Sequence, residues 1–349
     1  MMQILGGAEL RRYLESVTKR NGKESRERSA LVREIIDAVR RDGDAALRAF
    51  ARQFGDCVPQ NMKLEREELQ SLADTLDDSS RQVLDRAAAN IREFAEAVMK
   101  GVQPVTLDKS GYSTGMRFRP VERAGCYVPG GRFPLPSSAL MTALTARATG
   151  VRHVCIACPD PRPETAYAAI LADVDAFYAV GGAQAIAALA LGTESVDPVD
   201  IIVGPGNAYV TEAKRQLQGT VGIDMLAGPS EVAIFADESA DPATIAMDLL
   251  AQAEHDPDAR AWLVTVSKAI AESVQNELAR AVVTVDLPDF IGQSLKAGAI
   301  LVCSSLDESV EVLDSLAPEH LHLACKNAPA LLDRIDHFGA AFLGKAATV

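Results

Sequence analysis

The fold of this protein is decided by residues 151–218, which read VRHVCIACPDPRPETAYAAILADVDAFYAVGGAQAIAALALGTESVDPVDIIVGPGNAYVTEAKRQLQ. Three short apolar runs in this stretch, VRHVCIAC, AFYAV and DIIV, are each followed by an alanine-rich or amphipathic run of helical character. Where strands and helices alternate in this way, each helix carries the chain back to begin a parallel strand. The stretch therefore predicts an α/β domain built on a parallel sheet.

A second series of strands and helices begins with EVAIFAD at residues 231–237. It continues through AWLVTVS at 261–267 and AILVCSS at 299–305 to AAFLG at 340–344, with helical runs between them. We therefore expect a second α/β domain. The two series share no repeat of fixed short period, so their likeness is architectural.

The N-terminal part has a helical pattern instead. Between Glu9 and about Phe54, apolar residues recur at spacings of three and four, which is typical of amphipathic helices. A charged helix follows, for which Ser79 or Ser80 is the expected N-cap and Gly101 the expected end. We expect this part of the chain to be a helical segment.

The two predicted sheets are expected to belong to nested domains. Candidate junctions between them lie at about residues 119–125 and 227–230. We therefore predict an α/β protein with two Rossmann-like parallel-sheet domains, one inserted in the other. The outer domain would comprise residues 1–119 and 234–349, and the inserted nucleotide-binding domain residues 120–233.

Composition narrows the class of protein. The 349 residues carry a net charge of −13, and no block of Lys and Arg stands out that would bind a phosphate backbone. No run approaches the roughly 20 apolar residues that span a bilayer, and the first residues lack the layout of a secretory signal. We expect a cytoplasmic protein that binds neither nucleic acid nor membranes.

The six cysteines are scattered along the chain. Cys155 and Cys158 form a CxxC, but the pair lies in an apolar strand where the two sulfurs point to opposite faces. No second pair of Cys or His follows at the spacing of a zinc finger. We interpret the cysteines as buried thiols of a reducing compartment.

Three glycine-rich turns follow predicted strands, at the edge where open parallel sheets bind ligands. They begin at Tyr127 (YVPGG), at Val180 (VGGAQ) and at Val203 (VGPGN). Glycine lets a ligand approach the backbone, and a helix that starts at such a turn offers free N–H groups to a phosphate. Each turn alone could equally serve only to reverse the chain, and no GxGxxG with its downstream acidic residue is present.

The sequence Gln252-Ala253-Glu254-His255 places an amide and an imidazole three residues apart on a predicted helix. Side chains at this spacing share a face, so both can point at one ion or ligand. Imidazole is a common zinc ligand, whereas an amide oxygen is an uncommon one. The alternative is a helix end at which His255 only complements the helix dipole.

The sequence APEHLHL contains adjacent Glu319 and His320. A carboxylate beside an imidazole supplies two groups that can act as bases near neutral pH. The alternation of Glu319, Leu321 and Leu323 with His320 and His322 fits a surface strand equally well. We interpret His322, together with the more distant His337, as a surface or packing residue.

Taken together, these segments resemble the histidinol dehydrogenase family. The resemblance runs from about residue 25 to residue 345. It rests on long stretches that occur in one order: CYVPGGRFPLPSSALM, VGGAQAIAALALGTESV, VDIIVGPGNAYVTEAKRQ, IDMLAGPSEVAIFAD, DLLAQAEHDPDA and APEHLHL.

The resemblance implies a zinc enzyme that oxidises L-histidinol to L-histidine in two NAD-dependent steps through a bound aldehyde. Each role is carried over onto a matching motif. It implies NAD contacts from Tyr127, Gln184 and Asn207, substrate binding by Ser230 together with Gln252 and His255, zinc ligation by the same Gln252 and His255, and acid–base catalysis by Glu319 and His320.

In the family, a Gly-Asp-Tyr motif and an Asn-His pair follow the AAFLG strand, supply the remaining zinc ligands and reach a partner subunit. The sequence given ends at GKAATV without them. The resemblance therefore predicts a homodimer with weakened contacts, in which Gln252 and His255 are this chain's zinc ligands. Two alternatives stay open, namely a paralogue that oxidises another small polar alcohol and an inactive nucleotide-binding homologue.

Overall fold

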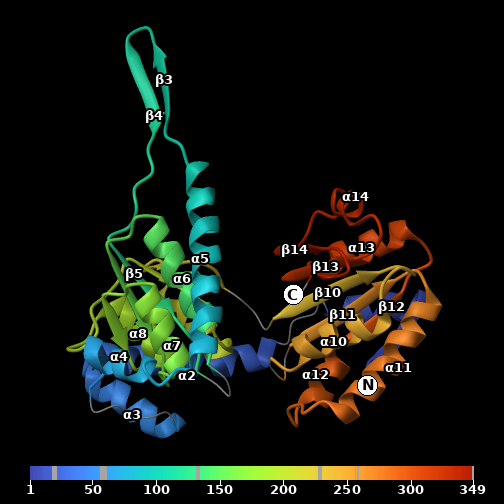
Figure 1. Ribbon diagram of the computed structural model, residues 1–349, viewed down its shortest axis with the longest axis horizontal. Helices are drawn as coiled ribbons and strands as arrows, with labels where there is room; N and C mark the ends of the chain where they lie inside the picture. Colours follow the sequence, from blue (N-terminus) through green and yellow to red (C-terminus); the bar gives the residue numbers. More distant parts are fainter. Residues whose placement is uncertain are drawn as a thin grey trace. The chain divides into compact units, whose positions relative to one another are not determined.

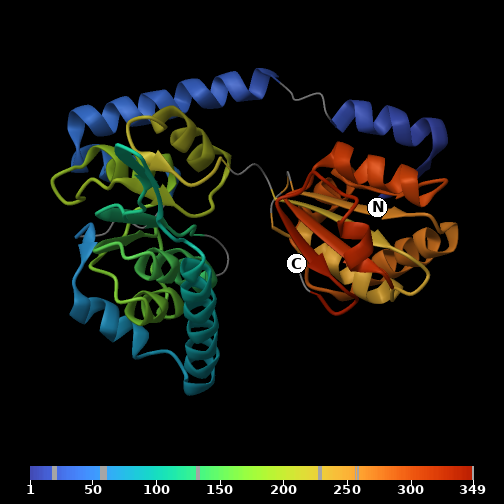
Figure 2. The ribbon, with the colours of Figure 1, turned by 90° about the horizontal axis from the view of Figure 1, so that it is seen from above.

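The chain folds into two compact α/β units, which are drawn in Figure 1 and Figure 2. The computed structural model describes residues 1–17, 22–55, 61–130, 134–226, 230–255, 257 and 259–347. Unit 1 comprises Met1–Gly22 and Pro229–Val349, and unit 2 comprises Lys23–Gly228. Each unit is built around a parallel sheet, so the predicted fold class is confirmed.

Unit 1 contains a six-stranded sheet in the order β1-β12-β11-β10-β13-β14, and all of its neighbouring strands are parallel. The first strand, β1, forms one edge of the sheet, and the last strand, β14, forms the other, because β13 and β14 are added beside β10. The strands are β1 (Gln3–Gly6), β10 (Glu231–Ala236), β11 (Arg260–Thr265), β12 (Ala299–Val302), β13 (His320–Ala324) and β14 (Ala340–Leu343).

Helices cover both faces of this sheet, as Figure 2 shows for unit 1. One face packs against α10 (Pro242–Ala253), α11 (Lys268–Thr284) and α12 (Ile291–Ala297). The other packs against α1 (Gly7–Val17), α13 (Leu306–Leu316) and α14 (Ala328–Leu332). Strand residues alternate between the two cores, as expected for a sheet that is buried on both sides.

Unit 2 contains a second six-stranded sheet, in the order β2-β7-β6-β5-β8-β9. Its strands are parallel except β2, which pairs antiparallel with β7. The strands are β2 (Lys63–Leu64), β5 (Arg123–Tyr127), β6 (His153–Ala157), β7 (Ala176–Tyr178), β8 (Ile201–Val203) and β9 (Gly222–Ile223).

Helices also cover both faces of the sheet in unit 2. One core includes residues of α2 (Gly22–Asp42), α3 (Asp44–Phe54), α8 (Gly182–Leu191) and α9 (Ala208–Leu217). The other core includes residues of α4 (Arg66–Ala73), α5 (Asp78–Lys100), α6 (Pro136–Ala148) and α7 (Pro163–Leu171).

An antiparallel hairpin of β3 (Val105–Lys109) and β4 (Tyr112–Met116) extends from unit 2 beyond the end of α5 (Figure 1). Every residue of both strands is exposed. The apolar side chains among them include Leu107 and Tyr112. We call residues 102–121, which contain this hairpin, the arm.

The N-terminal boundary of the predicted domains differs from the structure. We expected residues 1–119 to belong to the outer domain, but only residues 1–22 do, and the second junction falls at residues 228–229. The reason is packing, since α2 buries Val32 and Ile35 in the same core as Tyr127 of β5. The first residues are also not purely helical, because β1 pairs with β12 in unit 1.

No helix in the described ranges combines the length and the apolar character needed to cross a membrane.

Candidate active site

In unit 1 the predicted catalytic, substrate-binding and zinc-binding residues lie at one edge of the sheet. Ser230 directly precedes β10, and Glu319 directly precedes β13, whose first residue is His320. Because α10 connects the parallel strands β10 and β11, it runs antiparallel to both. Its last turn, which carries Gln252 and is followed by His255, therefore returns to the same edge as Ser230 and His320.

This edge is the amino edge of the sheet, where the strands begin. Ligands of open α/β sheets usually bind at the opposite, carboxyl edge. The rule that singles out the glycine-rich turns in unit 2 would therefore have missed this group of residues. Its members are identified by the QAEH and APEH motifs instead.

His320 lies on an interior strand, so the interpretation of APEHLHL as a surface strand is wrong. β13 is paired with β10 on one side and β14 on the other, and Leu321 and Leu323 are buried against α13 and α14. The rings of His320 and Phe342 form a T-shaped pair with 5.7 Å between centroids and 81° between planes.

The Nδ1 atom of His320 is buried and has no hydrogen-bond partner among the described residues. Leaving a buried polar atom unpaired costs about 1–3 kcal/mol, so such atoms are often reserved for a ligand. A ring nitrogen in this condition can accept a proton from a bound group. Ala317, two residues before Glu319, ends α13 in the left-handed conformation with φ 45° and turns the chain into this motif.

Gln252 and His255 occupy different environments at the end of α10. Gln252 is buried, and its Nε2 atom also lacks a partner within the described part of the chain. His255 is exposed, and its backbone N–H donates to the carbonyl of Gln252 at 3.3 Å. The helix end thus presents one buried amide and one exposed imidazole.

The described residues do not complete a zinc site here. Catalytic zinc is normally held by three protein ligands and keeps one position open. Gln252 and His255 supply two donors, and no group of three or more His, Cys, Asp or Glu residues that could hold a metal occurs in the described ranges. We therefore assign no chemical step to zinc.

In unit 2 the three predicted NAD-binding residues lie at the carboxyl edge of the sheet. Tyr127 ends β5, Gln184 lies in the first turn of α8 after β7, and Asn207 is the N-cap of α9 after β8. Tyr127 is 3% exposed, and its hydroxyl accepts a hydrogen bond from the Gly182 N–H at 3.0 Å. Tyr127 thus connects the first glycine-rich turn to the second.

Gln184 is buried, and its Oε1 atom is without a partner in the described structure. The side chain lies against Gly182, which has φ +68° and where a Cβ atom would come within 2.6 Å of Oε1. The positive φ favours glycine at position 182, and a side chain there would displace the Gln184 amide. The unpaired oxygen is a candidate acceptor for a ligand hydroxyl or amide.

Two residues that hold the third turn were not singled out in the sequence. Lys214 is 3% exposed, and its Nζ donates to the carbonyl of Gly204 and lies 2.8 Å from Oδ1 of Asp224. Oδ2 of Asp224 accepts from the Gly204 N–H at 2.7 Å. The sequence feature that could have identified Lys214 is its place on the apolar face of α9, between Val210 and Leu217.

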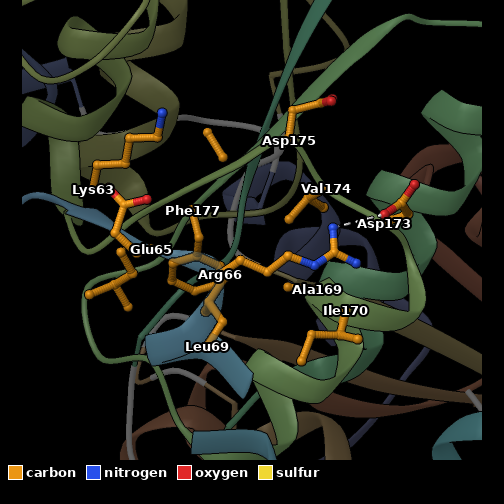
Figure 3. A pocket seen from close by; sticks show the side chains of 12 residues that line it. Lys63, Glu65, Arg66, Leu69, Ala169, Ile170, Asp173, Val174, Asp175 and Phe177 are labelled. Atoms are coloured by element: carbon orange, nitrogen blue, oxygen red, sulfur yellow. Dashed lines mark hydrogen bonds and ion pairs between the residues drawn. The ribbon is translucent and has the colours of Figure 1, made fainter. Parts of the chain in front are cut away.

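A cavity of about 380 Å³ in unit 2 is lined by none of the predicted site residues (Figure 3). It lies beside the start of β7, away from the carboxyl edge. Figure 3 shows charged side chains of both signs around it, with an ion pair of 3.4 Å between Arg66 and Asp173. These exposed charges neutralise one another and indicate no particular ligand.

Comparison with known proteins shows to which family the chain belongs. The family model described as histidinol dehydrogenase matches residues 18–349. Histidinol dehydrogenase of Methanococcus maripaludis is 42% identical over 322 residues, which are 91% of this chain and 76% of the relative. That of Geobacillus kaustophilus is 42% identical over 349 residues, or 98% and 80% of the two chains.

Solved structures agree with the sequence comparison. The crystal structure of histidinol dehydrogenase from Elizabethkingia anophelis has a TM-score of 0.90 and 29% identity, covering 99% of this chain and 81% of the other. An NAD-dependent aldehyde dehydrogenase from Sinorhizobium meliloti shares only the fold, with a TM-score of 0.52 and 14% identity. The chain belongs to the histidinol dehydrogenase family of oxidoreductases.

Proposed function

We propose that this protein oxidises L-histidinol to L-histidine with NAD, in two steps through a bound aldehyde, as an enzyme of histidine biosynthesis. The observation that carries the proposal is the group of Ser230, Gln252, His255, Glu319 and His320 at one edge of one sheet. Residues from three separate parts of the sequence lie at that edge, in a chain of the histidinol dehydrogenase family.

In the first step, a base must remove the proton of the alcohol while hydride leaves the carbon. His320 is the proposed base, because its buried and unpaired Nδ1 can accept that proton without first losing a hydrogen bond inside the protein. Bound NAD supplies the hydride acceptor in both steps.

In the second step, water must add to the aldehyde before the second hydride leaves. Glu319 precedes His320 in the chain and is partly exposed, so its carboxylate can reach both water and a bound substrate. We propose that it removes a proton from the attacking water. Ser230 and Gln252 would orient the substrate, and good orientation alone is worth several kcal/mol.

For NAD, we propose the carboxyl edge of unit 2. The arrangement of three turns after β5, β7 and β8 suits a dinucleotide, and Oε1 of Gln184 is free to accept from a donor group of such a ligand. Asn207 would contact NAD at the start of α9. Tyr127 would act by holding the backbone of Gly182.

The activity is tested by NADH absorbance when the purified protein is mixed with NAD and histidinol. We expect NADH from histidinol, and a loss of at least about 100-fold in kcat for His320→Ala with the fold retained. A strong preference for another amino alcohol would support the paralogue. NAD binding without NADH from any alcohol would support the inactive homologue.

We also propose that the protein is a homodimer in the cytoplasm. The arm supports the homodimer, since it exposes apolar side chains on a ribbon of two strands. It also carries three basic residues and one acidic residue, whereas the protein as a whole is acidic. A second copy of the chain offers the complementary charge. The five cysteines within the described ranges are buried free thiols, which suits a reducing compartment.

A further inference from the structure

His322 is a buried imidazole that connects three elements of unit 1. It lies in β13 and is fully buried. Its Nε2 lies 2.9 Å from the carbonyl oxygen of Gly344, just after β14, and its Nδ1 lies 3.4 Å from Oδ2 of Asp248 on α10. Because a carbonyl can only accept, Nε2 carries a proton and donates it to Gly344.

The other ring nitrogen faces a carboxylate that is itself mostly buried, with 15% of the Asp248 side chain exposed. Burial opposes the charged imidazole, but Asp248 and the Gly344 carbonyl together raise the pKa of His322 above its ordinary value. At 3.4 Å, Nδ1 and Oδ2 form an ion pair when the ring is protonated, and neither atom has a hydrogen-bond partner among the described residues. An apolar residue in its place would leave Oδ2 of Asp248 buried beside no cation.

The pair of His322 and Asp248 sets how α10 and β13 are aligned along their lengths. Gln252 follows Asp248 by four residues on the same face of α10, a rise of about 6 Å. His320 precedes His322 by two residues on the same face of β13, a distance of about 6.6 Å. The helix and the strand run in opposite directions, so both steps lead toward the amino edge and are almost equal in length.

We propose that His322 is a positioning residue, which holds α10 against β13 through Asp248 and thereby keeps Gln252 opposite His320. The chemical role of Gln252 and His320 rests on the proposed function, whereas the alignment of α10 with β13 does not. The Nε2 of Gln252 and the Nδ1 of His320 are both buried and unpaired in the described structure. One hydroxyl can satisfy both kinds of atom, since it can accept from an amide N–H and donate to a ring nitrogen.

The test uses two single variants and their combination. Asp248→Leu leaves the buried imidazole without its carboxylate, and His322→Leu leaves the buried carboxylate without its imidazole, whereas the double variant replaces both partners by apolar side chains. The control is His337→Leu, which changes a histidine of the same unit whose side chain is 67% exposed. Circular dichroism checks that each variant is folded.

We expect each single variant to weaken histidinol binding, measured by calorimetry without NAD, by about tenfold, with most of the loss recovered in the double variant. KM should rise accordingly, more than kcat falls. Wild-type affinity in both single variants, or a double variant no better than the weaker single one, would overturn the proposal.

Amide hydrogen exchange separates this proposal from the proposed function. The last turn of α10 and the first residues of β13 should exchange faster in the single variants and return toward the wild-type rate in the double variant. If the wild-type protein fails to bind histidinol while this pattern holds, the proposed function fails and the positioning role stands. An unchanged exchange pattern in folded single variants refutes the positioning role directly.

Discussion

Gly204 is a residue at which the backbone and its surroundings both exclude a side chain. Its φ is +117°, and a Cβ atom would lie 2.2 Å from the carbonyl oxygen of Tyr127. Its own N–H and carbonyl are held by Asp224 and Lys214. Because this turn is already held rigid, its backbone would lose little conformational freedom when a ligand binds.

Gly204→Ala should therefore cost more stability than its conformation alone explains. The matched control is Gly219→Ala, because Gly219 has φ +96° with nothing within 4 Å of the added carbon. We expect about 1–2 kcal/mol for the control and at least about 2 kcal/mol more for Gly204→Ala, measured by urea unfolding. Equal losses would mean that the contact with Tyr127 relaxes freely.

At the scale of the element, helix α9 is tied to α2 through the Gln216 amide, which also donates to the Glu212 carboxylate. Glu212 accepts from Arg215 at 2.6 and 2.7 Å and from Gln216 at 2.8 Å, and Gln216 also donates to the carbonyl of Ser29 on α2. These hydrogen bonds, with that from Arg215 the strongest, lower the pKa of Glu212 to about 2. The helix start is also capped locally, by Asn207.

This lowered pKa predicts a pH dependence. A carboxyl whose pKa is depressed on folding stabilises the protein above its unfolded pKa of about 4.5, and that stability is lost as the pH falls toward about 2. The difference in unfolding free energy between wild type and Glu212→Gln should thus shrink over this window. Urea midpoints at several pH values measure it, and a constant difference would contradict the assignment.

Local signals did not always choose the right residue within an element. Ser79 or Ser80 was the predicted N-cap of α5, but the helix is capped by Asp77, whose carboxylate accepts from the Ser80 N–H at 2.9 Å. Gly101 does end this helix. Several good capping residues in a row make the start of a helix ambiguous until the packed helix shows where its first turn lies.

At the scale of the whole molecule, the two units draw on different parts of the N-terminal region. Leu10 of α1 is buried in unit 1, and Ile35 of α2 is buried in unit 2. The two residues are only 25 positions apart in sequence, yet they belong to separate cores. This division was the part of the predicted domain organisation that the structure corrected.

Truncation of each side chain should show which unit it supports. Leu10→Ala should lower amide protection in unit 1 alone, and Ile35→Ala should lower it in unit 2 alone, each by about 2–4 kcal/mol. Hydrogen exchange with mass spectrometry measures both units at once. Loss of protection in unit 1 on Ile35→Ala would argue against the observed division.

The arm gives a prediction about assembly. Replacing residues 105–116 by a short Gly-Ser turn removes exposed strands that contribute no core residue, so unit 2 should remain folded. We expect the wild-type protein to be dimeric by light scattering and the shortened protein to dissociate at a concentration at least about tenfold higher. A dimer of unchanged stability would exclude the arm as the contact surface.

The sequence by itself determined the class of fold, the three glycine-rich turns and the family motifs, because these depend on short-range periodicity and on residues that are neighbours in the chain. Only the tertiary structure decided which strands lie side by side. It places β13 next to β10, so that APEH comes beside Ser230, and it lets α10 bring QAEH to the same edge. It also made His322 a buried partner of Asp248, two residues 74 positions apart. Contacts of this range depend on how whole elements pack, and no local pattern in the sequence encodes them.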